Sequence, residues 1–248
     1  MLRHTEEAMG TVFSFALRGG APAVLGPAVA ELHRLDALFS TYRPQSQLSR
    51  LGRGELTVEE CDPLVAEALA ACATVRADSG GWFTARPGGR LDLSGWVKGW
   101  AVERASDLLV AAGCPDHTVT GGGDVQARGT AADGRPWRIG VADPARPGAV
   151  AAVLAGRGAF AVATSGTAER GAHIVDPHTD RPAPGTHSVT VVGPQLALTD
   201  AYATAAFAMG PQRALDWIAA LPAHEALVVL PDGRRLGTPG LVRHLADD

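Results

Sequence analysis

Residues 92–100 (DLSGWVKGW) combine an acid, two glycines and Lys98, the only lysine among the chain's 22 lysine and arginine residues. An ammonium is a compact point charge on a flexible stem, which suits close contact with an anion better than a guanidinium does. A helix that opens through Gly95 would add backbone amides and a favourable dipole. The segment predicts a phosphate-type site without P-loop spacing, although chance could also place a single lysine here.

Asp200 and Thr204 are four residues apart in an alanine-rich segment, so a helix would place their oxygens on one face. One carboxylate, one hydroxyl and open coordination positions suit Mg²⁺, which retains waters and takes further ligands from substrate phosphates. A structural explanation stays open, in which Thr199 is an N-cap and Asp200 is an acid favoured by the dipole of the first turn.

A third group of polar residues follows the Thr-Ser-Gly sequence at 164–166. His173 has Asp176 three residues on, next to a turn that Pro177 stiffens, and this pair could act as a general base with an orienting carboxylate. His178 is a second candidate, and either histidine could instead be structural. A phosphate-type site, a hard-metal site and a base are together the groups needed to break a phosphoanhydride.

Two glycine-containing turns, residues 8–11 and 121–124, could bring backbone close to a ligand or could be ordinary tight turns. The remaining hydrophobic and capping patterns predict strands and helices in mixed runs rather than strict βαβ alternation. This order favours an α+β fold in which antiparallel sheets are covered by helices. The predicted strands are 10–17, 90–93, 117–120, 137–141, 151–154, 159–164, 188–192 and 226–230; the predicted helices are 23–39, 57–77, 97–112, 198–209 and 211–221, with a polar loop at 41–54.

Composition excludes several classes of function. The net charge of −4 without a basic block argues against non-specific binding of nucleic acid. Cys61, Cys72 and Cys114 lack CxxC spacing and are expected to be reduced core residues. The N-terminus has no apolar signal region and the chain no apolar stretch of about 18 residues, so we expect no membrane insertion and a cytoplasmic location.

The motifs, taken in order, resemble the ApbE family of FAD:protein FMN transferases, or flavinyltransferases, over nearly the whole chain. The resemblance implies one domain over residues 1–248 with an α+β fold of mixed, largely antiparallel sheets covered by helices, of the ApbE/T-fold-like type. The motifs that carry it are residues 8–11, 39–50, 92–100, 122–124, 164–166, 173–177 and 199–204.

The resemblance also implies an activity and a set of site residues. Such enzymes use Mg²⁺ to cleave the pyrophosphate of FAD and transfer FMN through a phosphoester bond to a Thr or Ser hydroxyl of an acceptor flavoprotein, releasing AMP. By position, His173 matches the residue that deprotonates the acceptor hydroxyl. The matching metal ligands are the side chains of Asp200 and Thr204 and the backbone oxygens of Gly95 and Ala203. The matching FAD contacts are Met9, Tyr42, Trp82, Phe83, Thr84, Asp92, Lys98 and Ile174.

Three departures from the family pattern concern the flavin ring more than the pyrophosphate. Thr84 stands where the family has an aspartate, the following segment is shortened to residues 85–91, and the turn after His178 ends in Asp180. Two other functions remain open: a Mg²⁺-dependent FAD pyrophosphatase giving FMN and AMP, and a non-catalytic FAD-binding protein.

Overall fold

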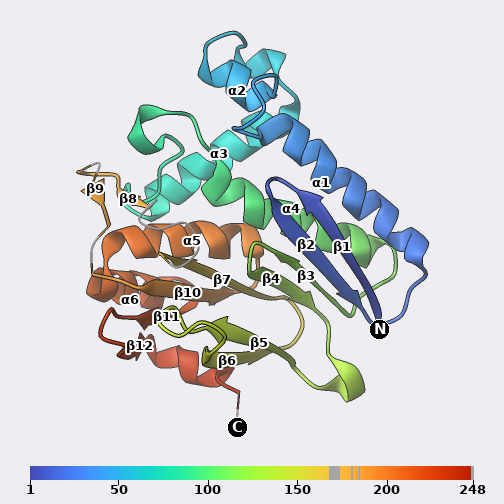
Figure 1. Cartoon of the computed structure of the whole chain (residues 1–248), viewed down its shortest axis with the longest axis vertical. Coiled ribbons are helices and arrows are strands. Elements are labelled where there is room, and N and C mark those ends of the chain that lie inside the picture. The colour runs from blue at the N-terminus through green and yellow to red at the C-terminus, as the bar shows by residue number, and fades with distance from the viewer. Residues whose placement is uncertain (168–173, 180, 184, 247–248) are drawn as a thin grey trace.

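The computed structural model describes residues 1–167, 174–179, 181–183 and 185–246 (Figure 1). Its centre is an eight-stranded sheet, and every strand pairing in the described residues is antiparallel. In spatial order the strands are β1 (Leu2–Ala8), β2 (Thr11–Leu17), β3 (His117–Gly121), β4 (Asp124–Arg128), β7 (Phe160–Gly166), β10 (Ser188–Gly193), β11 (Glu225–Val229) and β12 (Arg235–Gly237).

The remaining elements pack on this sheet or on the helices that cover it. Two hairpins pair β5 (Trp137–Ala142) with β6 (Val150–Gly156) and β8 (Val175–Asp176) with β9 (Arg181–Pro182). The α-helices are α1 (Leu25–Phe39), α2 (Gln47–Gly52), α3 (Pro63–Asp78), α4 (Ser94–Ala111), α5 (Leu196–Met209) and α6 (Pro211–Ala220). Short 3-10 helices span Pro22–Val24, Val58–Glu60, Pro87–Gly89, Ala132–Gly134 and Pro239–His244.

The sheet buries both of its faces in its C-terminal half. Ala226 and Val228 of β11 join a core with the α-helices, whereas Leu227 and Val229 join a second core with β5 and β6. Because successive strand residues point to opposite faces, a strand covered on both sides is apolar throughout. Figure 1 shows α5 on one side of the sheet and the β5–β6 hairpin on the other. The α+β expectation is confirmed.

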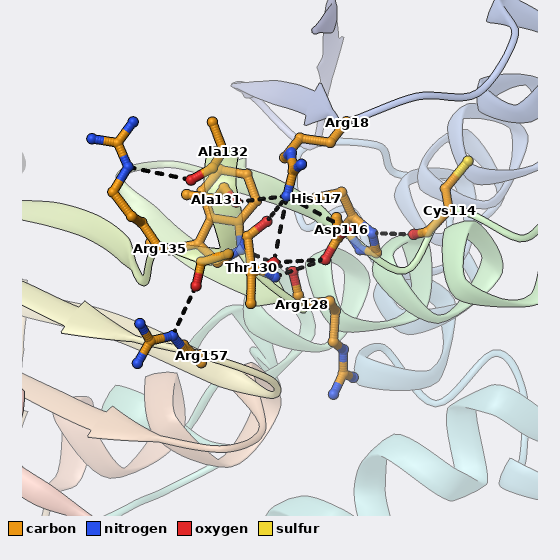
Figure 2. A network of polar contacts seen from close by, with 12 residues as sticks. Arg18, Cys114, Asp116, His117, Arg128, Thr130, Ala131, Ala132, Arg135 and Arg157 are labelled. Atoms are coloured by element: carbon orange, nitrogen blue, oxygen red, sulfur yellow. Dashed lines mark hydrogen bonds and ion pairs between the residues drawn. The ribbon is translucent and has the colours of Figure 1, made fainter.

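A polar network closes the end of the sheet where β2 finishes and β3 begins (Figure 2). The Arg18 guanidinium donates to the carbonyl oxygens of Thr130 and Ala131 at 3.1 and 2.6 Å. The Asp116 carboxylate accepts from the Thr130 amide at 2.7 Å. These bonds satisfy the backbone of the connection that follows β4, which would otherwise lack partners.

Most predicted elements are present, and three predictions were wrong. Residues 90–93 form no strand, because this stretch leads into α4 and the Asp92 carboxylate accepts from the Ser94 amide at 2.8 Å. The capping box at Thr57 forms but closes only a 3-10 turn, and α3 starts separately at Pro63 with Asp62 as its N-cap. The polar loop at 41–54 contains α2.

Five strands, β1, β4, β8, β9 and β12, were not predicted. Cys72 and Cys114 are buried and unpaired as expected, whereas Cys61 is partly exposed rather than in the core. Burial raises the pKa of the Cys72 thiol to about 12, so this cysteine is unreactive. Among the described residues, none of the helices combines the length and apolarity that a bilayer-spanning segment needs.

Candidate functional site

The site forms where α4 crosses α5, and Gly99 of α4 permits the contact. A Cβ at this position would lie 2.7 Å from the Leu196 carbonyl oxygen and 2.8 Å from the Asp200 Cβ. With glycine here, the backbone amide of Gly99 reaches the Asp200 carboxylate and donates to its Oδ2 at 3.1 Å. The crossing thereby fixes the position of Asp200, which is 4% exposed.

Helix α5 begins earlier than the sequence predicted, and this changes the explanation of Asp200. Its N-cap is Gln195, so Thr199 is not a cap; the Thr199 hydroxyl is buried and donates to the Gln195 carbonyl at 2.7 Å. Asp200 therefore lies beyond the first turn, where the helix dipole stabilises an acid less. Its interaction partners come from α4 instead.

Other elements cap the N-terminus of α5. The Leu196 amide donates to Gln126 of β4, and the Ala197 amide donates to Glu103 of α4, both at 2.9 Å. Burial raises the pKa of the Glu103 carboxyl. These two acceptors anchor the helix that carries Asp200 to the sheet and to α4.

Lys98 lies between two buried carboxylates. Its Nζ is 3.0 Å from Oδ2 of Asp200 and also contacts Oδ2 of Asp124, the first residue of β4. The other oxygen of Asp124 accepts from the Thr164 amide at 2.8 Å. Gly122 allows this approach, since a Cβ there would lie 3.2 Å from the lysine Cδ. The same position would lie 3.5 Å from the Thr11 hydroxyl, so the two glycine-containing turns lie next to each other.

Thr204 lies one turn beyond Asp200, and its hydroxyl is 3.3 Å from the Ser165 hydroxyl of β7. A Cβ on Gly95 would lie 3.7 Å from the Thr204 methyl and 3.2 Å from the Phe83 ring, so the start of α4 packs against this part of α5. Ala203 is the buried neighbour of Thr204 in α5. The structure thus brings together the four predicted metal positions.

The donor chemistry of this region fits a hard cation. Within the described residues, no three His, Cys, Asp or Glu side chains are grouped to hold a metal ion. The available donors are the Asp200 carboxylate, the Thr204 hydroxyl and backbone carbonyls, all of them oxygens. Oxygen ligands with few carboxylates are typical of Mg²⁺, which takes its remaining ligands from water and phosphates.

Phe83, whose ring lies beside the Gly95 position, follows Trp82 in the chain. The Trp82 ring packs edge-on to the His178 ring, with centroids 4.6 Å apart, and the Arg213 guanidinium lies 4.8 Å from its centroid. Phe83 is buried, and the Thr84 hydroxyl accepts from the Arg86 amide at 3.0 Å within a local turn.

The other predicted FAD contacts have different surroundings. Asp92 caps the start of α4, and Ile174 packs partly buried against the main core. Met9 adopts a positive φ of 54° in the β1–β2 turn. Tyr42 is 89% exposed between α1 and α2, and the structure does not place it in contact with Lys98 or Asp200.

His173, the predicted base, lies outside the described residues. The prediction that Asp176 orients it is therefore untested; within the described residues the Asp176 oxygens accept from the His178 amide at 2.8 Å and the Thr179 hydroxyl at 3.0 Å. These two bonds stabilise the turn that follows Asp176. His178, the second candidate base, packs against Trp82.

Sequence reasoning did not single out Asp124, which contacts Lys98, or Arg213, whose guanidinium lies over the Trp82 ring. The Gly-rich turn before Asp124 was a local signal, but it did not identify Lys98 as the partner of this carboxylate. Nothing in the local sequence of Arg213 points to Trp82, because α6 and that loop meet only in the folded chain.

Comparison with known proteins supports both fold and family. A protein named FAD:protein FMN transferase from Rhodobacter capsulatus is 37% identical over 167 residues, covering 63% of this chain and 31% of the relative. One of the same name from Vibrio cholerae is 34% identical over 134 residues, covering 50% of this chain and 40% of the relative. The matched segments thus span less than half the length of these curated relatives.

Solved structures with the same fold align along almost the whole chain. The flavin transferase ApbE from Vibrio cholerae superposes with a TM-score of 0.86 at 21% identity, covering 98% of this chain and 99% of that chain. The ApbE protein from Thermotoga maritima gives a TM-score of 0.86 at 23% identity, covering 99% of each chain. The sequence profile of the ApbE family matches residues 9–88 and 84–228, and the chain belongs to this family.

Proposed function

We propose that this chain is a Mg²⁺-dependent FAD:protein FMN transferase, which moves FMN from FAD to a Thr or Ser hydroxyl of an acceptor flavoprotein. The observation that carries the proposal is the packing of Asp200 and Thr204 of α5 against the start of α4, with Lys98 beside them. The names of the curated relatives support the same reaction.

The metal ligands in this proposal are the Asp200 carboxylate, the Thr204 hydroxyl and the backbone oxygens of Gly95 and Ala203. When bound, Mg²⁺ supplies charge neutralisation and polarises phosphoryl oxygens. Lys98 contributes a further positive charge, close to where the pyrophosphate negative charge grows. Gly99 holds Asp200 in place through its amide, so the carboxylate is oriented before the substrate arrives.

The bond changes follow from the products. The acceptor hydroxyl oxygen forms a bond to the FMN-side phosphorus, and the bond from that phosphorus to the bridging oxygen breaks. AMP leaves with the bridging oxygen, and His173 takes the proton of the acceptor hydroxyl. If water takes the place of the hydroxyl, the same groups produce free FMN and AMP.

The test is an incubation with FAD, MgCl₂ and an acceptor flavoprotein domain, with product detection by in-gel fluorescence, intact mass and chromatography. The proposal predicts a fluorescent acceptor whose mass has increased by one FMN, together with free AMP. Free FMN with an unmodified acceptor would identify a pyrophosphatase, and unchanged FAD would identify a binding protein.

Variants assign the roles within this assay. Asp200→Asn is expected to lower transfer about 100-fold or more, because a metal-binding carboxylate is lost. His173→Ala is expected to lower transfer by about 10²–10⁴-fold while Mg²⁺-dependent FAD binding persists. Asp216→Asn, an exposed carboxylate on α6, is the matched control and should transfer normally. Full activity of Asp200→Asn or His173→Ala would remove that residue from the mechanism.

A further inference from the structure

The Lys98 ammonium is the only side-chain cation that the structure gives as an ion-pair partner of Asp124 or Asp200 in the described residues. The side chains of Asp124 and Asp200, taken alone, are 2% and 6% exposed, and both contact the same Nζ. Each carboxylate also accepts one backbone amide, from Thr164 for Asp124 and from Gly99 for Asp200. Two buried carboxylates that contact the same ammonium repel each other, and the positive charge between them offsets this repulsion.

The two carboxylates differ in what else they can bind. Asp200 shares α5 with Thr204 and faces the start of α4, so it belongs to the candidate oxygen cluster for a divalent cation. Asp124 lies on β4, and its second oxygen is held by the Thr164 amide. An ammonium bonded to Asp200 and a metal ion bonded to the same oxygen would repel each other.

The stem of Lys98 is suited to a change of partner. It passes over Gly122, and the Lys98 side chain, with its four flexible carbons, is 22% exposed. The ammonium can therefore leave Asp200 and remain on Asp124 without any movement of α4. The Asp124 carboxylate, which the Thr164 amide holds in place, would then be the remaining ion-pair partner of the Lys98 ammonium.

We infer that Lys98 is the cation that neutralises the site when no metal is bound. Its ammonium holds Asp200 in position and competes with the divalent cation for that carboxylate. When the divalent cation binds, the ammonium leaves Asp200 and stays on Asp124. This inference rests on the proposed function, because it assigns the divalent cation to Asp200. Lys98 is a positioning residue in this arrangement, and Asp124 is the residue that retains it.

Isothermal calorimetry with MgCl₂ in the absence of FAD, together with thermal unfolding, tests the inference. Lys98→Met keeps the length of the stem and removes the charge. It should bind Mg²⁺ at least about tenfold more tightly than the wild type, because the competing cation has gone. Its metal-free form should unfold several degrees lower, and Mg²⁺ should raise its Tm by more than it raises the wild-type Tm.

Arg104→Met is the matched control, because Arg104 lies on the same helix and pairs with Glu31 at 2.7 Å, away from the two carboxylates. It should leave the Mg²⁺ affinity unchanged. If Lys98→Met does not fold, Lys98→Met is combined with Asp124→Asn to restore the charge balance. This double variant should then bind Mg²⁺ more tightly than Asp124→Asn alone.

Equal or weaker Mg²⁺ binding by Lys98→Met than by the wild type would overturn the inference, as would the same result for the double variant against Asp124→Asn. The proposed function fails differently. If Asp200→Asn leaves Mg²⁺ binding unchanged, the metal site itself is misassigned. If the wild type modifies no acceptor, the transferase assignment is wrong whatever Lys98 does.

Discussion

At the scale of single residues, the site depends on Gly99 as much as on the charged side chains. Only glycine fits at this position, because a methyl group would overlap the Leu196 carbonyl oxygen and the Asp200 side chain. The acid at Asp200 and the amide that holds it therefore form one unit.

Gly99→Ala is expected to separate α4 from α5, with a cost of about 1–3 kcal/mol in the free energy of unfolding. Because Asp200 would move with α5, transfer should fall by at least about tenfold. Urea unfolding and the FMN-transfer assay measure both effects. Gly26→Ala on α1 is the control, since nothing lies within 4 Å of its Cβ and a helical alanine there should be neutral or stabilising. Equal stability and activity of the two variants would show that the crossing tolerates a Cβ.

At the scale of elements, α5 is the helix on which the site depends. It is buried around most of its circumference, which explains its alanine-rich sequence: small residues let the sheet and neighbouring helices approach. Its first amides bond to Gln126 and Glu103, which come from β4 and α4, so the helix start is fixed by its neighbours.

Glu103→Ala leaves the Ala197 amide without its acceptor and should lower the free energy of unfolding by about 1–2 kcal/mol. Glu103→Gln keeps an acceptor oxygen and should cost less. Burial raises the pKa of the Glu103 carboxyl, so the wild type loses free energy of unfolding as the pH rises above the ordinary pKa of this group. The Gln variant has no carboxyl here and should lack this loss. Chemical denaturation of the wild type and both variants between pH 4 and 7 checks this, because the loss begins near the ordinary pKa of 4.5; a larger loss for Gln than for Ala would contradict the capping role.

At the scale of the whole molecule, the two ends of the central strands differ in function. Strand β3 ends at Gly121, next to Gly122, whose Cβ position lies near Lys98 and Thr11. It begins at His117, next to the network of Arg18 and Asp116. One end holds the candidate site, and the other fastens the connections between strands (Figure 2).

His117 makes the fastened end sensitive to pH. It is fully buried; its Nδ1 donates to the Cys114 carbonyl at 2.7 Å and its Nε2 accepts from the Ser106 hydroxyl at 2.8 Å. Burial lowers the pKa of His117, and also that of His224. Below the ordinary histidine pKa of about 6.5, the unfolded chain binds protons that the folded chain excludes.

The free energy of unfolding should therefore be flat above about pH 7 and fall as the pH drops below about 6.5, with these two histidines contributing up to about 1.4 kcal/mol per pH unit each. Urea unfolding of the wild type at pH 7.5, 6.5 and 5.5 measures the slope. The double variant His117→Gln and His224→Gln should be less stable at pH 7.5 but have a smaller slope below pH 6.5. An unchanged slope would place the acid sensitivity elsewhere.

The sequence by itself determined the oxygen pair of Asp200 and Thr204, most helices and strands, and the family resemblance. Helical and strand periodicity are local properties, so features that depend on residue spacing within one helix or strand can be predicted from the sequence. The sequence did not predict α2, and it predicted one continuous helix where the chain breaks before Pro63. Both boundaries depend on local capping bonds.

Only the tertiary structure decided which distant residues contact one another in the site. Lys98 and Asp124 are 26 residues apart, and Gly99 and Asp200 are 101 residues apart. Both contacts arise because α4 packs on α5 and on the end of β4. No local pattern encodes that approach: it is set by the burial of two helices against one sheet, with a glycine where they meet.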